Sequence, residues 1–535
     1  MVATPADERA RPADDAPAPA LARMRRLAQA ALVVLTGFML SRLLGALRNI
    51  VIAAHFGTGA QFDAYVAAIA LPDLVFQVLV GGAVGSAFIP VFKRYLAEGE
   101  ERDAWHLTSS VVNIFVLVAG GTALVLGVLS RPIMDVWVAG EDPAFRDLVA
   151  SLTRILLISP AIFAASTFCS SVLNSYHRFA VAAAAPLLYN LAIILAAIFL
   201  SAPFGIYGLA IGAVSGALAH LLVQLPFCLR LGMRWRPSVD LHHPGVWEVA
   251  QLFAPRVLGL GVIQLNQVLS GIVLASFLGA ASIGYLNYAW QMIMMPLALA
   301  MAVGTAVFPT LSEESALRNS ARFQQVFLLS LRMILFLTIP ASIGLMVLGQ
   351  PVIRLFFERG QFGPDSTTGT AYAVVFYAIG LAGHATVEIV DRVFYARHDT
   401  RTPVLVAISA VGLNVVASLV LMRTALGYGG LALANSMAAL TEAGALILII
   451  AQRMPAVRID ALAASALRVL AASLVMGLPV AWLASRLDPL LVPHGTPGQA
   501  VLLTTCIACG AAIYALASWL FRSDELRMLR HLVKR

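Results

Sequence analysis

The sequence predicts an all-α integral membrane protein with about 14 transmembrane helices, arranged as two parallel six-helix lobes plus two C-terminal helices. Three observations support this prediction: long apolar runs, an alternation of basic and uncharged loops, and an internal repeat. Hydrophobic residues make up 60% of the 535 residues and charged residues only 12%, whereas a soluble protein is about one quarter charged. One soluble core cannot absorb this apolar surface, because such cores stop growing near roughly 250–300 residues.

The apolar runs indicate helices rather than strands. In lipid, every backbone N–H and C=O group needs an internal partner, so only helices and closed barrels span a membrane. Barrel strands alternate in short runs, whereas these runs reach the roughly 20 residues that a helix needs to cross the ~30 Å hydrocarbon core. The predicted spans cover residues 27–54, 62–92, 107–130, 148–174, 180–201, 204–229, 247–278, 282–311, 325–349, 367–395, 403–422, 427–451, 464–485 and 499–521.

Basic residues gather at every second junction between these spans. The even-numbered junctions carry Lys93, Arg94, Arg178, Arg230, Arg318, Arg397 and Arg453, whereas the odd junctions 55–62, 201–205 and 279–284 carry no Arg or Lys. Loops rich in Lys and Arg stay in the cytoplasm. We therefore expect a multi-pass protein with both termini cytoplasmic.

Composition divides the chain into five parts. Residues 1–24, rich in Ala, Pro, Asp and Arg, are predicted to be a disordered cytoplasmic tail. Residues 25–235 form the N-lobe with spans 1–6, residues 236–455 the C-lobe with spans 7–12, and residues 456–521 the last two spans. Residues 522–535 are basic and amphipathic, as expected of a cytoplasmic surface helix.

Three echoes at a spacing of about 220 residues relate the two lobes. AVGSAFIP (83–90) recurs as AVGTAVFP (302–309), IVIAAHFG (50–57) recurs as IVLASFLG (272–279), and 176–190 is echoed more loosely in 395–414. The offset covers six spans, an even number, so the two lobes have the same orientation. Parallel repeats of this kind place a binding site between the lobes near the midplane.

The composition argues against enzymes and nucleic-acid binders. The basic residues are scattered between apolar runs, so the net charge of +8 forms no nucleic-acid face. The ten histidines are dispersed, and we find no H-E-x-x-H, P-loop or nucleophile-elbow motif. Cys506 and Cys509 lie within an apolar run, where helix packing is favoured over redox or metal chemistry. Transport is the predicted activity.

Five stretches of the sequence resemble signatures of the MurJ (MviN) family of lipid II flippases. They are SRLLGALRNIVIAAHFGTGAQFDAYVAAIALPDLV, GSAFIPVFKRY, LNSYHRFAVAAAAPLLYN, LFFERGQFGPDST and FYARHDTRTPV. The resemblance runs from about residue 30 to about 520. It implies the multidrug/oligosaccharidyl-lipid/polysaccharide (MOP) exporter fold, with the last two helices forming a lipid-facing groove. It also implies alternating-access transport of an undecaprenyl-diphosphate-linked peptidoglycan precursor across the bacterial inner membrane.

The resemblance also sets the expected partners and energy source. No cofactor is expected beyond a membrane potential or an ion gradient. The expected partners are the lipid-linked precursor and membrane lipids, with cell-wall synthesis proteins as further candidates and no nucleic acid.

Arginines within the spans are the first candidate site residues, because a charge costs at least ~2.5 kcal/mol at a helix centre. Arg42 and Arg48 lie six residues apart in span 1, which offsets them by roughly 120°. The resemblance assigns both to the cavity, where guanidinium groups would bind phosphate. Snorkelling to the interface is the alternative. Arg256, early in span 7, could also meet substrate phosphate.

Uncharged polar residues complete the expected substrate site. Asn49 stands where the family has Asp, and Gln291 where the family has the Arg of an Ala-Asp-Arg motif. Both are expected to contact substrate. Asn266 in span 7 is expected either to do the same or to form an interhelical hydrogen bond.

Acidic residues are candidates for gating or coupling. Asp63 opens span 2, either as an N-cap or as a gate partner for a basic residue of the opposite lobe. Asp73 follows Pro72, which frees a backbone carbonyl, and could couple transport to ions or protons. Glu388, Asp391 and Arg392 cluster in span 10, where Glu388 and Arg392 are spaced to form a structural i, i+4 pair.

Several charges that the family usually carries are missing here. Phe76 replaces an Arg, and Gly81 and Met294 replace acids. Besides a lipid II flippase, the sequence therefore leaves open an exporter of another polyprenyl-linked glycan and a non-transporting scaffold that binds cell-wall lipid intermediates.

Overall fold

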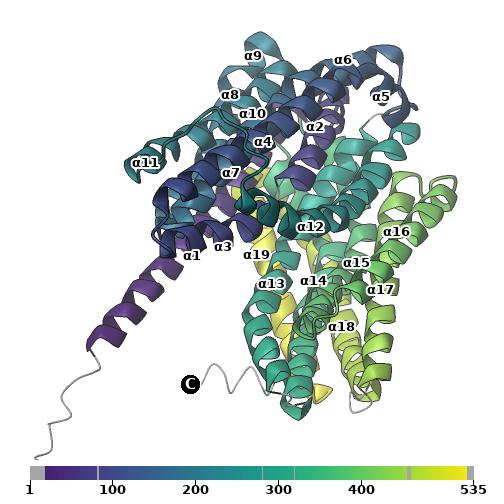
Figure 1. The fold of residues 1–535 in the computed structure, drawn as a ribbon. Coiled ribbons are helices and arrows are strands. Elements are labelled where there is room, and N and C mark those ends of the chain that lie inside the picture. The colour runs from purple at the N-terminus through teal and green to yellow at the C-terminus, as the bar shows by residue number, and fades with distance from the viewer. Residues whose placement is uncertain (1–17, 81–82, 280, 318–319, 455–458, 527–535) are drawn as a thin grey trace, which may run out of the picture.

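The computed structural model (Figure 1) describes residues 18–80, 83–279, 281–317, 320–454 and 459–526. The side chains of residues 18–35 and 254–263 lie outside this description. Throughout the described ranges the chain is helical and contains no strand, which confirms the all-α prediction.

The first half of the chain forms the N-lobe, the upper-left group of helices in Figure 1. Its helices are α1 (Ala18–Phe56), α2 (Ala60–Leu79), α3 (Ala83–Ala97), α4 (Glu101–Val128), α5 (Ser130–Trp137), α6 (Pro143–Leu156), α7 (Ile158–Ser175), α8 (Phe179–Phe199), α9 (Ser201–Phe204), α10 (Ile206–Leu222) and α11 (Leu225–Arg230).

The second half forms the C-lobe, at the lower right of Figure 1, with α12 lying between the two groups. Its helices are α12 (Pro244–Val268), α13 (Ser282–Ala316), α14 (Ser320–Phe357), α15 (Pro364–Ala396), α16 (Arg401–Leu421) and α17 (Tyr428–Arg453). The last two helices, α18 (Ile459–Leu491) and α19 (Gly495–Leu520), are joined by a 3-10 turn at Val492–His494 and pack on α14.

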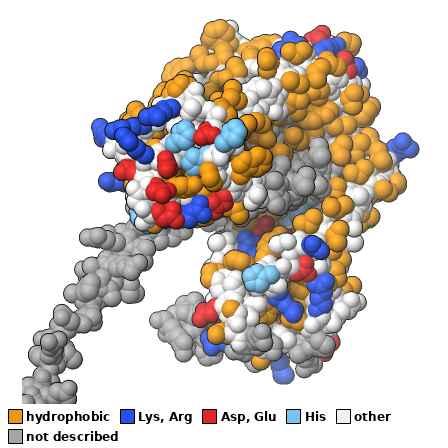
Figure 2. Space-filling view, in the orientation of Figure 1, with side chains coloured by type: hydrophobic (Ala, Val, Ile, Leu, Met, Phe, Trp, Pro, Cys, Tyr) orange, Lys and Arg blue, Asp and Glu red, His pale blue; other side chains and the backbone are white. Residues whose placement is uncertain are grey.

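The helices are long and apolar enough for a membrane. Twelve helical runs in the described residues qualify as spans. The last of them, Asp460–Leu520, contains both α18 and α19, and α12 coincides with the predicted seventh span. Splitting that run and adding α12 gives the fourteen predicted spans. Figure 2 shows hydrophobic side chains over most of the visible surface, with charges gathered toward the ends of the lobes.

Four predicted spans are interrupted within the described residues, one of them span 6, which divides into α10 and α11. Span 2 comprises α2 and α3, and span 4 comprises α6 and α7, which meet at Leu157. Pro160 explains the break in span 4, because it has no N–H to donate to the carbonyl of Leu156 and its ring clashes there. Span 7 ends in a π-helical turn at Leu269–Val273 followed by a 3-10 turn at Ala275–Leu278. Such turns are frequent at functional hinges.

The internal repeat extends to the backbone. Residues with positive φ recur at an offset of 221 or 222, in the pairs Gly57 (60°) and Gly279 (90°), His177 (58°) and His398 (59°), and Gly205 (55°) and Gly427 (53°). Equivalent turns therefore connect equivalent helices in the two lobes.

Part of the predicted N-terminal tail differs from expectation. Helix α1 begins at Ala18, so residues 18–24 of the predicted disordered tail are helical. The Ala-rich run here favours helix, and residues 1–17 lie outside the described residues. At the other end, Asp524 to Leu526 start a helical turn, whereas residues 527–535 fall outside the description.

Candidate functional site

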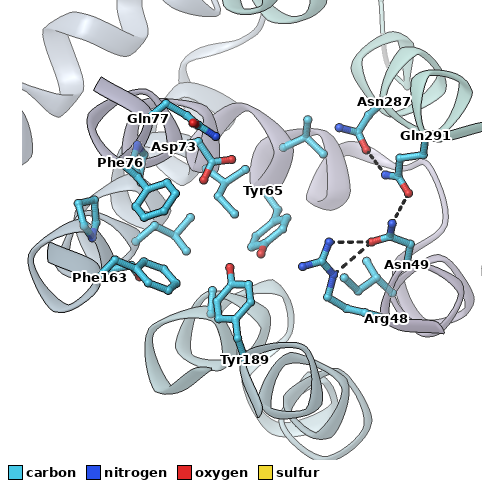
Figure 3. Close-up of a pocket in the computed structure, with 18 of the residues that line it drawn as sticks. Arg48, Asn49, Tyr65, Asp73, Phe76, Gln77, Phe163, Tyr189, Asn287 and Gln291 are labelled. Atoms are coloured by element: carbon cyan, nitrogen blue, oxygen red, sulfur yellow. Dashed lines mark hydrogen bonds between the residues drawn. The ribbon is translucent and has the colours of Figure 1, made fainter. Parts of the chain in front are cut away.

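A cavity of about 470 Å³ lies mainly within the N-lobe and reaches the C-lobe. Side chains from α1, α2, α6, α7, α8 and α10 form most of its wall, and α13 of the C-lobe supplies Asn287, Tyr288 and Gln291. Figure 3 shows the polar groups of this cavity. The sequence analysis predicted a site between the lobes, and the cavity is consistent with that position although it is displaced toward the N-lobe.

Arg48 is connected to the C-lobe through a chain of amides. Its Nε and Nη2 atoms each donate to Oδ1 of Asn49 at 3.2 Å. Asn49 Nδ2 donates to Oε1 of Gln291, and Gln291 Nε2 donates to Oδ1 of Asn287 at 2.7 Å (Figure 3). The structure therefore brings three predicted site residues, Arg48, Asn49 and Gln291, into one network across the lobes.

Among the described residues that line the cavity, Arg48 is the one Arg or Lys and Asp73 is the one acid. No carboxylate lies within ion-pair distance of Arg48 among the described residues. Because Asn49 occupies only two of the five guanidinium N–H groups, Arg48 keeps donors for an anionic guest.

Asp73 faces the same cavity from α2, with two tyrosines between it and Arg48. In Figure 3 the hydroxyl groups of Tyr65 and Tyr189 point toward each other in the space between the two charged side chains. Arg48, Asp73 and both tyrosines line the cavity together. The cavity therefore contains the carboxyl group of Asp73 and the guanidinium group of Arg48 without a direct ion pair between them.

Pro72, which precedes Asp73, interrupts the hydrogen bonding of α2 as expected. The carbonyl of Ala68, four residues earlier, instead accepts a hydrogen bond of 3.3 Å from the Thr153 hydroxyl of α6. The same hydroxyl also donates to the carbonyl of Val149 at 2.8 Å in its own helix, so α2 and α6 share this hydrogen.

Asp63 contacts the opposite lobe, but through the backbone. Its Oδ1 accepts a hydrogen bond of 3.0 Å from the N–H of Gly284, in the first turn of α13, and its side chain is buried. It does not cap its own helix, since the N-cap residue of α2 is Gly59 and has no side-chain cap bond. The predicted basic gate partner is therefore replaced by the positive end of a helix dipole.

The contact of Asp63 belongs to a closed seam between the lobes. Thr58 Oγ1 and Ser366 Oγ are 2.7 Å apart, and the N–H of Gln361 donates to the carbonyl of Ala54 at 2.9 Å. Gly57 and Gly360, with φ of 60° and 58°, meet the facing backbone so closely that a Cβ atom on either would overlap it.

An aromatic cluster lies next to this seam. Phe62 of the N-lobe stacks on Tyr288 of α13 with ring centroids 4.6 Å apart, and Tyr288 also packs on Phe357 and Phe362. Phe62 and Tyr288 line the cavity as well, so the cluster forms its wall at the closed end.

Two other predicted substrate residues, both with described side chains, lie outside the cavity lining. Arg42 is exposed, with its guanidinium carbon 5.2 Å from the centre of the Phe38 ring. Asn266 accepts a 2.9 Å hydrogen bond from Asn414, which also donates to Ser270. The structure thus gives Asn266 the interhelical bond that the sequence analysis kept as one of two options. The side chain of Arg256 lies outside the described side chains.

The predicted cluster of span 10 is a structural contact within the C-lobe. Arg392 Nη1 and Glu388 Oε2 are 2.7 Å apart, which confirms the i, i+4 pair. Arg392 also lies against Gly304 of α13. Asp391 Oδ1 is buried without a hydrogen-bond partner among the described residues. None of the three lines the cavity.

Tyr65, Tyr189, Asn287 and His220 line the cavity but were not singled out from the sequence. Aromatic residues on an apolar helix are indistinguishable from core packing by pattern alone. Asn287 lies four residues before Gln291, on the same helix face, and this spacing was the available signal.

Comparisons with known proteins identify the family. The family model described as lipid II flippase MurJ matches residues 52–498, more than half of the chain. The probable lipid II flippase MurJ of Vibrio cholerae is 32% identical over 427 residues, covering 78% of this chain and 81% of the relative. The lipid II flippase MurJ of Burkholderia cenocepacia is 28% identical over 505 residues, covering 91% and 96%.

Comparison with solved structures agrees with this family assignment. A structure titled lipid II flippase MurJ, inward closed conformation, is 26% identical, with a TM-score of 0.76 over 92% of this chain and 99% of that chain. An inward-facing multidrug resistance MATE family transporter of the MOP superfamily is 14% identical, with a TM-score of 0.66 over 80% and 98%. The second likeness concerns the fold alone.

Proposed function

The chain belongs to the lipid II flippase MurJ family, and on that premise we propose that it moves lipid II, the undecaprenyl-diphosphate-linked peptidoglycan precursor, across the bacterial cell membrane. Transport proceeds from the inner to the outer leaflet by alternating access. The protein binds and releases its cargo and catalyses no covalent change in it.

One observation carries the proposal most directly: the cavity holds Arg48 as its single Arg or Lys, without a carboxylate in ion-pair contact among the described residues. A diphosphate presents several anionic oxygens, and a planar guanidinium binds two of them at once. The amide chain from Asn49 to Gln291 orients that guanidinium and joins it to the other lobe. A substrate that binds Arg48 is therefore connected to both lobes through this hydrogen-bond chain.

The direction of transport follows from the closed seam. Loop charge supports a cytoplasmic position for both termini, which puts the junctions at Gly57, Gly279 and Gly360 on the outer side. The cavity then receives cargo from the cytoplasmic side. To release it outward, the lobes must break the contacts of Asp63 with α13 and of Thr58 with Ser366. A membrane potential or an ion gradient supplies the energy, with Asp73 as the acid best placed to respond.

Two other functions remain as alternatives. Export of another polyprenyl-linked glycan would use the same diphosphate contact, and only the fit of the sugar and peptide would differ. A non-transporting scaffold would bind the lipid intermediate but would not need the lobes to separate.

Depletion of the protein in its native cell separates these functions. We expect growth to stop and lipid II to accumulate in the inner leaflet, with rescue by the wild-type chain. Rescue by a chain locked shut through a Thr58→Cys/Ser366→Cys disulfide would favour the scaffold. Normal leaflet distribution of lipid II after complete depletion would contradict the proposal.

A further inference from the structure

A second polar group reaches the cavity from α10. His220 lies in the last turn of that helix and lines the cavity, and its ring packs edge-on against Phe163 with centroids 5.4 Å apart. Ser166 on α7 contacts the Nδ1 atom of His220 at 2.7 Å. No hydrogen-bond partner of the other ring nitrogen, Nε2, is present among the described residues.

Gln224 fixes the direction of these hydrogen bonds. Its Nε2 atom lies 2.8 Å from the backbone carbonyl of His220, and since a carbonyl only accepts, the amide nitrogen must be on that side. The same nitrogen donates to the Ser166 hydroxyl at 2.9 Å, and the amide oxygen accepts from Ser170 at 2.6 Å. The amide orientation is therefore determined by its neighbours.

The tautomer of His220 follows. The Ser166 oxygen accepts from Gln224, and the described residues offer its hydrogen no acceptor other than Nδ1 of His220, so the hydroxyl donates there. The Gln224 amide nitrogen, also a donor, lies 3.3 Å from the same Nδ1 atom. A ring nitrogen that accepts carries no proton, and the proton of the neutral imidazole is then on Nε2. Because Nδ1 is engaged on α7, Nε2 is the nitrogen that is left for the cavity.

We propose that His220 is a specificity-determining residue of the transport site, whose Nε2–H donates a hydrogen bond to an uncharged oxygen of the cargo headgroup. This inference rests on the proposed function. Arg48, the one Arg or Lys in the described lining of the cavity, takes the diphosphate. A neutral N–H donor instead suits the hydroxyl and amide carbonyl oxygens of the sugar and peptide. Ser166 and Gln224 are positioning residues that hold the tautomer.

Two lipid probes test this assignment on the purified full-length protein in lipid nanodiscs. Undecaprenyl diphosphate offers the phosphates alone, and lipid II offers the same phosphates with sugar and peptide. We expect His220→Phe, which retains an aromatic ring beside Phe163, to weaken lipid II binding by about 3- to 10-fold. Its affinity for undecaprenyl diphosphate should not change. Arg48→Gln should weaken binding of both probes.

Conservative variants identify the atom that matters. Glutamine can place an amide N–H near the position of Nε2, whereas asparagine reaches only as far as Nδ1. His220→Gln should therefore retain most lipid II affinity and His220→Asn should lose it. Ser166→Ala should give an intermediate loss, because Nδ1 can then take the proton. The matched control is His384→Phe, since His384 contacts Asn435 through Nε2 and does not line the cavity.

Each other outcome overturns the inference. Unchanged lipid II binding by His220→Phe would show that Nε2 contacts nothing in the cargo. An equal loss for both probes would place the contact on the phosphates, and an equal loss in the Gln and Asn variants would mean that the ring only fills space. If the wild-type chain binds neither probe, the proposed function itself fails, and that result is distinct from all of these.

Discussion

The two lobes share a repeat but differ in how they treat polar side chains. The N-lobe surrounds a cavity with an arginine that lacks an acidic partner, an acid and two phenols. The C-lobe pairs arginine with glutamate within α15, as in Arg392 with Glu388. It also pairs arginines of α14 with acids of the C-terminal segment, as in Arg354 with Asp488 and Arg332 with Glu525. The same backbone plan therefore serves binding in one half and rigidity in the other. Mutations of arginine should accordingly affect cargo in the N-lobe and stability in the C-lobe.

The largest effect should follow from removing Arg332. It contacts Glu525 at 2.7 Å and Asp524 at 3.0 Å, and Glu525 is only 2% exposed. Arg332→Met leaves a buried carboxylate without its cation, at a cost of about 3 kcal/mol. Thermal unfolding in detergent should show a clearly lowered Tm, with binding of undecaprenyl diphosphate unchanged at low temperature.

The double variant Arg332→Met/Glu525→Leu provides the control for that result. With both charges gone, no unpaired ion is buried, so most of the lost Tm should return. A double variant as unstable as the single one would show that Arg332 acts through packing alone.

Arg48→Gln should give the next largest effect, and on cargo rather than on stability. Loss of charge-assisted hydrogen bonds to a diphosphate weakens binding about 10- to 100-fold, so this variant should fail to rescue depleted cells while its Tm stays close to that of the wild type. Arg42→Gln is the matched control in the same helix, and we expect it to rescue. Equal failure of both variants, or rescue by both, would remove the distinction between the two arginines.

Asp63→Ala should have a smaller effect, on the closed seam. Loss of the bond to the Gly284 N–H, comparable to loss of a helix cap, costs about 1 kcal/mol and shifts the lobes toward the open state roughly fivefold. Spin-label distances across the seam in lipid nanodiscs measure this shift. Asp365→Ala, an exposed acid beside Ser366, should leave the distances unchanged. A closed population unaffected by Asp63→Ala would mean that the aromatic cluster alone holds the seam.

The smallest effect is expected at the loop between α15 and α16. Hydrogen bonds from Thr402, together with Arg453 at 2.5 Å, hold the pKa of the Asp399 carboxyl well below its usual range. A carboxyl group whose pKa is lower in the folded than in the unfolded protein stabilises the fold at pH values above its unfolded-state pKa, which is near 4. This stabilisation is lost as the pH falls below that unfolded-state pKa. Tm should therefore decline slightly below about pH 4, and less so in Asp399→Asn. An identical decline in both would assign the effect to other acids.

Much of the fold could be predicted because it depends on residue type along the chain. Apolar runs located the spans, because lipid imposes both the length and the apolar composition of each span. The internal repeat indicated two lobes. The break at Leu157 had a visible cause in Pro160. The π-helical turn at Leu269–Val273 was not predicted, because residues 247–278 form one continuous apolar run.

The site was only partly predictable. Arg48 and Asp73 were identified because charges are costly in an apolar span, and Asn49 and Gln291 because they stand at positions that the family resemblance marks. The partner of Asp63 could not be identified, since it is a backbone N–H 221 residues away and every residue carries one. Tyr65 and Tyr189 were missed because an aromatic ring satisfies a core position and a cavity wall equally well.

The backbone-to-backbone meeting of Gly57 and Gly360 with the opposite lobe has an electrical consequence. A cavity wide enough for a hydrophilic headgroup would let ions leak across the membrane if it opened to both sides at the same time. The two glycines allow the main chains of the lobes to meet directly, and the stacked rings of Phe62 and Tyr288 lie beside this contact. The seam thus preserves the voltage across the membrane while the cargo waits on the other side.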